Sequence, residues 1–187
     1  ETVNRIMLQT TPQDAVDLYE AISIAQPGGM GKQDQFDVND EESKTKIIKE
    51  KVTLFDVLKL SSSWDLIARE LTSSMPITFN IGFPTFKETY KKADMNAAVV
   101  QTFLTILSNF QDTLIQRQHG KEAAVKVTNE AMEILNKGGI LTGQGLKALK
   151  SLDKKLQKRG INPGTTADLT ASSIMVGLID YYWDKIE

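Results

Sequence analysis

The chain of 187 residues contains no cysteine and only one histidine, His119. The absence of cysteine excludes disulfide bonds, thiolate metal sites and cysteine nucleophiles, and it is typical of a cytoplasmic protein. Zinc sites in proteins are built mainly from Cys and His, so a chain with one His argues against zinc. The site chemistry must therefore come from carboxylates, hydroxyls, basic side chains and backbone groups.

Long hydrophobic runs and an excess of one charge are also absent. No apolar stretch reaches the roughly 18 residues that suggest a transmembrane helix, so no membrane partner is predicted. The 22 basic and 24 acidic side chains give a net charge of -2, so we expect no general attraction to nucleic acid. The length and the 41% hydrophobic content fit one globular domain with a sizeable core.

Apolar residues recur with helical spacing through most of the chain, which predicts an all-α fold. We expect one compact multi-helix domain over residues 1–187, with a buried C-terminal helix because residues 174–179 are apolar on all sides. Residues 79–86 have some β character, and a loop followed by a short helix is the alternative. The longer predicted helices cover residues 11–25, 53–74 with a break near 61–63, 95–118, 122–136, 142–159 and 165–183.

The stretch 161–170 combines a turn, a helix start and a carboxylate. Asn162 and Pro163 favour a turn, and Thr165 with Asp168 three residues later resembles a capping box. Pro163 at the first helical position is a second possible start. Either start leaves backbone N–H groups open at a helix N-terminus, which suits a phosphate or a metal-bound phosphate. An ordinary capped helix is the alternative interpretation.

A Gly-rich segment, residues 26–31, is followed by several acidic residues that include Asp37. It is not a Walker loop, which needs Gly-Lys-Ser/Thr, nor a dinucleotide fingerprint, which needs a preceding strand. The acidic residues also lack the Gly and Glu positions of an EF-hand loop. A solvated loop is the plain alternative.

These segments resemble one family. Residues 162–170, Asn-Pro-Gly-Thr-Thr-Ala-Asp-Leu-Thr, are similar to the C-terminal signature of the triphosphoribosyl-dephospho-CoA synthase family, in its archaeal-type branch. Residues 15–31 with the following Asp37-Val38 resemble the same branch. Residues 112–117 resemble the family's Asp-Thr block, and residues 64–70 resemble a segment in which an Asp and an Arg stand one turn apart.

The resemblance implies an ATP-dependent transferase that joins ATP to 3′-dephospho-CoA, releases adenine and retains the triphosphate. Such a site needs a carboxylate near the developing oxocarbenium ion, a base for the attacking hydroxyl, and Mg²⁺ or donors for the triphosphate. The candidate residues are Asp112 and Asp168 for catalysis; Asp37, Asp112 and Asp168 for Mg²⁺; and Gly28, Gly29, Gly31, Arg69, Arg117, Asn162, Gly164, Thr165 and Thr166 for the nucleotide.

Two basic features have plainer alternatives. Arg69 stands four residues after Asp65, a spacing typical of a surface ion pair worth a few tenths of a kcal/mol. The helix predicted over residues 142–159 carries a run of basic residues on its outer face, which is typical of solvated helices but could also attract a polyphosphate.

Archaeal-type members of the family carry a further N-terminal block, with an Asn-Thr and Gly-rich signature, that has no counterpart here. We therefore expect the chain to correspond to the C-terminal part of the family and to be an incomplete form of the enzyme. A non-catalytic helical protein that binds a nucleotide or a partner is the competing hypothesis. The expected partners are ATP and dephospho-CoA or a related acceptor, in the cytoplasm, and the oligomeric state is left open.

Overall fold

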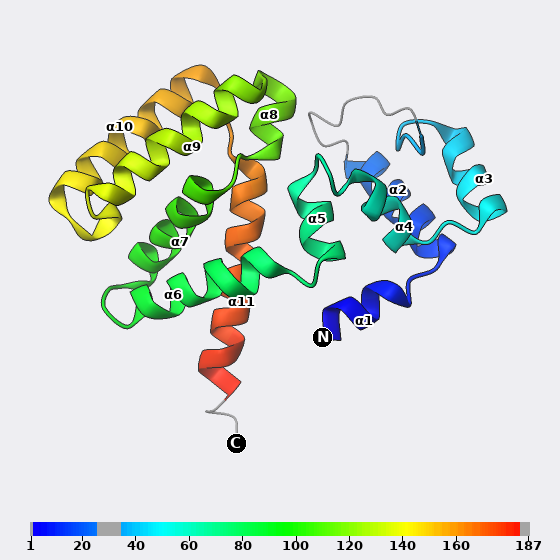
Figure 1. The fold of residues 1–187 in the computed structure, drawn as a ribbon, viewed down its shortest axis with the longest axis horizontal. Coiled ribbons are helices and arrows are strands. Elements are labelled where there is room, and N and C mark those ends of the chain that lie inside the picture. The colour runs from blue at the N-terminus through cyan, green and yellow to red at the C-terminus, as the bar shows by residue number, and fades with distance from the viewer. Residues whose placement is uncertain (1, 26–34, 184–187) are drawn as a thin grey trace. The chain divides into compact units, whose positions relative to one another are not determined.

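The computed structural model describes residues 2–25 and 35–183, and this part of the chain is helical without any β-strand (Figure 1). The all-α prediction is therefore confirmed. Contacts divide the chain into two compact units, Glu1–Met75 and Pro76–Glu187, each of which is described by itself. The described helices are α1 (Thr2–Leu8), α2 (Pro12–Ala25), α3 (Glu41–Glu50), α4 (Leu54–Ser61), α5 (Leu66–Thr72), α6 (Phe83–Tyr90), α7 (Met95–Asn109), α8 (Thr113–His119), α9 (Lys121–Asn136), α10 (Gly143–Arg159) and α11 (Gly164–Trp183), with short helical turns η1 (Thr78–Gly82) and η2 (Gly139–Leu141).

The first unit is built around α2, which contacts α3 and α4. Its predicted start is confirmed, because the Asp14 carboxylate accepts hydrogen bonds from the backbone N–H and the hydroxyl of Thr11 at 2.6 and 2.7 Å. The buried cluster of this unit is small and consists of Ala15, Val16, Tyr19 and Ile47.

The predicted break within residues 53–74 is also confirmed. Thr53 and Asp56 form a capping box at the start of α4. Asp65 starts α5 by accepting from the N–H groups of Ile67 and Ala68, both at 2.9 Å. The Asp65 carboxylate therefore acts as a helix cap, a role that its four-residue spacing to Arg69 did not indicate.

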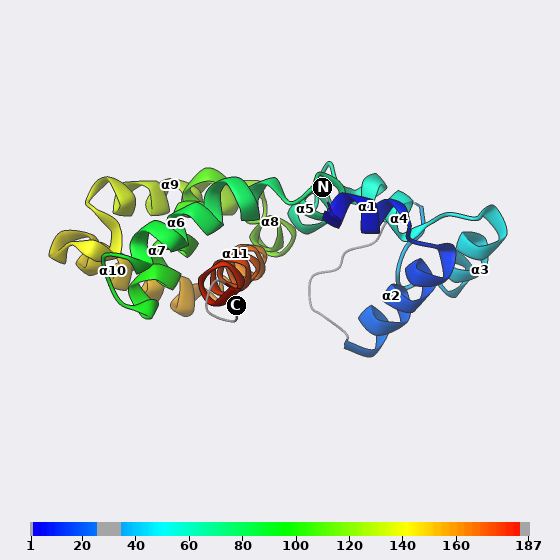
Figure 2. The same cartoon turned by 90° about the horizontal axis from the view of Figure 1, so that it is seen from below.

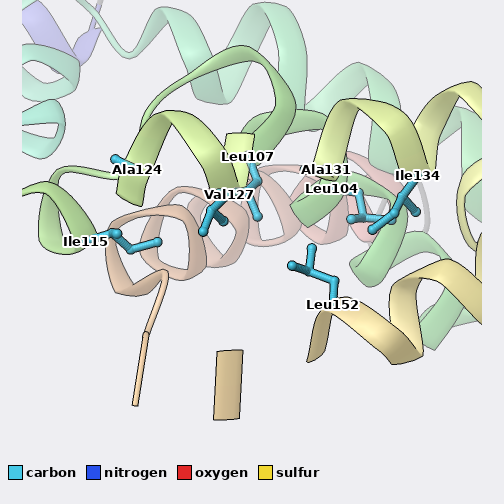
Figure 3. Packing of buried hydrophobic residues seen from close by; sticks show 8 residues of the cluster. All are labelled: Leu104, Leu107, Ile115, Ala124, Val127, Ala131, Ile134 and Leu152. Carbon is cyan, nitrogen blue, oxygen red and sulfur yellow. The ribbon is translucent and has the colours of Figure 1, made fainter. Parts of the chain in front are cut away.

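The core of the second unit lies between α7, α8, α9 and α10. Buried residues on α9 recur at steps of three and four, which places them on one face of the helix. Figure 3 shows this face packed against neighbouring helices, and the labelled residues are Ala124, Val127, Ala131 and Ile134 of α9 with Leu104, Leu107, Ile115 and Leu152.

The long helix predicted over residues 95–118 is wrong, since the chain forms two helices there. Phe110 is extended, with φ -132° and ψ 135°, and ends α7. The side chain of Asp112 then caps α8. Apolar character alone does not predict burial in α7, since Met95 is 37% exposed whereas Ile106 is fully buried.

Burial of α11 is confined to one face, so the predicted burial on all sides is wrong. Thr166, Thr170, Ser173 and Gly177 are among its buried residues, while Met175 is 64% exposed. Figure 2 views α11 nearly end-on and shows α6, α7 and α8 around one side of it. Small residues face these neighbours, which lets the helices approach closely.

Residues 78–90 form the helical alternative and not a strand. The π-helical turn η1 runs directly into α6. Pro84 stands in the first turn of α6, directly after η1, where it has no N–H to donate back to a carbonyl of η1. Among the described helices of both units, none is long and apolar enough to cross a bilayer.

Candidate functional site

Asp112 is fully buried, and its carboxylate joins the starts of two helices. Its Oδ1 accepts the backbone N–H groups of Leu114 and Ile115 in α8, both at 3.0 Å. Its Oδ2 accepts the backbone N–H and the hydroxyl of Thr166 in α11, at 2.7 and 2.8 Å. Since an N–H group donates to each oxygen, both oxygens act as acceptors, as in an ionised carboxylate.

Further contacts hold the same two helix starts together. The hydroxyls of Thr113 and Thr165 lie 3.1 Å apart, and the Leu114 N–H donates to the Thr165 hydroxyl at 3.2 Å. A Cβ on Gly164 would lie 2.6 Å from Cδ2 of Leu114, so glycine permits this close approach. The Asp-Thr block and the C-terminal signature therefore meet in space.

Asp168 is exposed, unlike Asp112. It follows Thr166 by two residues, which rotates its side chain by roughly 200° around α11 and away from the Asp112 contact. In the described part of the chain, no three His, Cys, Asp or Glu residues are grouped so as to hold a metal ion. This geometry argues against one Mg²⁺ ion shared by Asp112 and Asp168.

The backbone N–H groups expected to be open at the start of α11 are in part already used. The Gly164 N–H donates to the Asn162 carbonyl at 2.9 Å, and the Thr166 N–H donates to Asp112. In this structure oxygens of the chain itself accept from these two N–H groups, and the phosphate contacts expected at Gly164 and Thr166 stay a prediction. The Thr165 cap is wrong, since α11 begins at Gly164 and the Thr165 hydroxyl contacts α8.

Asp37 belongs to the first unit and is only 8% exposed. Its Oδ1 accepts the N–H of Asn39 at 2.8 Å. The Tyr19 hydroxyl donates to the carbonyl of the neighbouring Phe36 at 2.5 Å. Burial, and to a lesser degree the Asp37 charge, raises the pKa of Tyr19 to about 12. Asp37 is thus fixed beside a protonated phenol, and its role as a Mg²⁺ ligand stays a prediction.

The other candidates are spread more widely. Gly28, Gly29 and Gly31 lie outside the described residues. Arg69 is exposed on α5 of the first unit. In the second unit, Arg117 is half-buried in α8 and Asn162 is exposed just before α11. Both of these stand on segments that the Asp112–Thr166 contact holds.

A family model described as ATP:dephospho-CoA triphosphoribosyl transferase matches residues 1–186. The chain belongs to this family. The resemblance inferred from residues 15–38, 112–117 and 162–170 is thereby confirmed.

Known members and structures support the same assignment. A crystal structure from Archaeoglobus fulgidus, provisionally described as a triphosphoribosyl-dephospho-CoA synthase, is 30% identical with a TM-score of 0.76, over 94% of this chain and 68% of that chain. The 2-(5″-triphosphoribosyl)-3′-dephosphocoenzyme-A synthase of Escherichia fergusonii is 31% identical over 54% of this chain and 34% of the relative. The Klebsiella pneumoniae synthase is 37% identical over 42% and 26%. The chain thus spans about a quarter to a third of these curated relatives.

Thr113 was not among the site residues expected from the sequence, yet its hydroxyl contacts Thr165 in the C-terminal signature, residues 162–170. A signal was available, because Asp is a favoured N-cap and Asp112 directly precedes a run that can form a new helix. The continuous apolar spacing through residues 103–114 hid that second helix start.

Proposed function

We propose that this chain forms part of an ATP-dependent transferase that moves the triphosphoribosyl group of ATP onto 3′-dephospho-CoA or a related acceptor. The observation that carries the proposal is the junction of the two family-like blocks. Asp112 and Thr166 stand 54 residues apart in the chain, yet they share two hydrogen bonds. The family match and the fold likeness support the same reaction.

In this reaction a ribose hydroxyl of the acceptor forms a bond to C1′ of the ATP ribose. The bond from C1′ to the adenine nitrogen breaks, and adenine leaves with that electron pair. The hydroxyl proton goes to a base, the departing adenine nitrogen takes up one proton, and all three phosphates stay on the transferred ribose. Positive charge builds at C1′ during the step, so a nearby carboxylate stabilises it, and we assign this role to the exposed Asp168.

Mg²⁺ is proposed as the ion that accompanies the triphosphate. Proteins usually hold Mg²⁺ through one or two carboxylates together with substrate phosphates and water, and not in an all-protein cage. The described residues fit this mode, because they contain no three-carboxylate group and Asp112 is already used. Asp168 would hold the ion in the second unit, and Asp37 is the candidate in the first. The ion would neutralise phosphate charge.

The alternative is a non-catalytic helical protein that binds a nucleotide or a partner. One observation favours it, since Asp112, one of the two carboxylates expected to be catalytic, is fully buried and bonded to the starts of α8 and α11. For the transferase, we propose the cytoplasm as the compartment, where ATP is available.

Adenine release separates the two functions. The purified chain is incubated with Mg²⁺ and ATP, with and without dephospho-CoA, and adenine is measured by chromatography. The transferase predicts adenine only when both substrates are present, together with a product whose mass equals dephospho-CoA plus the triphosphoribosyl group. Binding of ATP without any adenine release favours the non-catalytic protein.

A further inference from the structure

We infer that Asp112 is a positioning residue, which holds the first turn of α11 so that Asp168 faces the nucleotide. This inference rests on the proposed function. It removes Asp112 from the metal ligands and bases, and it assigns the nucleotide to the outer side of the turn that contains Asn162 and Asp168.

The Asp112 carboxylate is fully occupied by hydrogen bonds within the chain. It accepts four hydrogen bonds between 2.7 and 3.0 Å, two at each oxygen. An ionised carboxylate offers about four acceptor sites in all. A Mg²⁺ ion or an acceptor hydroxyl would have to displace bonds that join α8 to α11, in a place that solvent does not reach.

The charge of Asp112 also balances the positive N-terminus of α11. The N-terminus of a long helix attracts anions because its N–H groups and its dipole point toward them. In α11 the carboxylate of Asp112 is the anion at this position, and it accepts hydrogen bonds from the N–H and the hydroxyl of Thr166. The chain therefore supplies an internal anion at the position that the sequence suggested for a phosphate, and the triphosphate is left to bind on the outer side.

Contacts at the start of α11 set the direction in which the Asp168 side chain points. The Thr113–Thr165 contact and the approach of Leu114 to Gly164 fix the rotation of the first turn about its axis. Asp168 follows Gly164 by four residues and Thr165 by three, so it lies on the same face of α11 one turn further on, where it is exposed. A change at the Asp112–Thr166 junction should therefore rotate or loosen the Asp168 side chain without touching it.

The test uses Thr166→Val, which removes one bond to Asp112 and keeps its carboxylate. Thr166→Ser retains the hydroxyl, and Thr105→Val is the matched control because the Thr105 hydroxyl bonds only the Gln101 carbonyl of its own helix. MgATP affinity is measured by calorimetry at a temperature where circular dichroism shows every variant folded. We expect affinity to fall about tenfold in Thr166→Val, and to stay near the wild-type value in Thr166→Ser and Thr105→Val.

The Mg²⁺ dependence of ATP binding separates positioning from ligation. In Thr166→Val the half-saturating Mg²⁺ concentration should not change. A folded Thr166→Val with wild-type MgATP affinity would overturn the inference. A folded Asp112→Asn in which ATP binding no longer depends on Mg²⁺ would also overturn it. Either result leaves the proposed function intact if the wild type releases adenine. A wild type that neither binds MgATP nor releases adenine would overturn both.

Discussion

At the scale of single residues, Asp112 is a buried charge whose desolvation is offset by donors from two helices. An ionised carboxylate is costly to bury unless hydrogen bonds replace its water. Here three backbone N–H groups and one hydroxyl replace that water. The sequence and the family resemblance named Asp112, Thr165 and Thr166 as site residues. Their mutual contacts could not be predicted, because nothing local links residues 54 positions apart.

The hydroxyl of Thr166 should contribute measurably to stability. Thr166→Val leaves Asp112 with one donor fewer, and hydrogen bonds to charged groups are worth about 1.5–3 kcal/mol. We expect the free energy of unfolding, measured by urea denaturation, to fall by that amount. Thr105→Val should change it by less than about 0.5 kcal/mol, since that hydroxyl bonds only within its own helix. Equal losses in both variants would contradict the account.

Tyr19 should make stability depend on pH in the alkaline range. Its pKa is about 12 in the folded chain, against 10.0 for the ordinary phenol. The folded state therefore holds the proton more tightly, so this stabilisation is complete below pH 10 and is lost as pH rises toward 12. Two pKa units correspond to roughly 2–3 kcal/mol.

Tyr19→Phe provides the comparison that isolates this group from other alkaline titrations. The difference in unfolding free energy between wild type and Tyr19→Phe should shrink between pH 9 and pH 12. Over this range the stabilisation from the protonated Tyr19 phenol is lost in the wild type, whereas the phenylalanine ring of the variant has no proton to lose. A difference that stays constant over this range would show that Tyr19 does not titrate as described.

At the scale of elements, the capping signals at Thr11 and Thr142 were reliable, whereas the cap expected at Thr165 and the burial patterns were not. Thr11 and Thr142 start helices as their sequences predict, because a cap is satisfied within a few residues. The break at Phe110 was hidden, since apolar spacing continues across it. The partial exposure of α11 was also missed, because apolar content alone does not reveal which face finds a neighbour.

Close packing of α11 against η1 depends on Gly82. A Cβ at this position would lie 1.9 Å from Oγ of Ser173 and 3.2 Å from Cδ1 of Ile106, and both neighbours are fully buried. Gly82→Ala should therefore lower the free energy of unfolding by about 1–3 kcal/mol.

Gly143→Ala is the control for this substitution. Gly143 stands in the first turn of α10, and an added Cβ would have no atom within 4 Å beyond its chain neighbours and the backbone of its own helix, so stability should stay the same or rise slightly. Thermal or urea unfolding of the two variants side by side checks the prediction. A Gly82→Ala protein as stable as Gly143→Ala would show that the two elements do not pack as tightly as described.

At the scale of the whole molecule, the chain carries the family's helical blocks but covers 68% of the Archaeoglobus fulgidus chain. We expect adenine release by this chain to require both ATP and dephospho-CoA, because the acceptor hydroxyl must attack C1′ of ATP before adenine leaves. Steady-state adenine release by the purified chain, with each substrate varied in turn, measures this requirement. Adenine release that does not depend on dephospho-CoA would contradict the transfer.

The most direct test of the central claim is the fate of the γ-phosphate of ATP. ATP labelled in that phosphate is incubated with the chain, Mg²⁺ and dephospho-CoA, and the labelled species are separated. The account predicts that the label moves into a product containing dephospho-CoA, in equal amount to the adenine released, because no phosphate bond breaks. Label appearing as free phosphate or pyrophosphate, or remaining entirely in ATP, would contradict the triphosphoribosyl transfer.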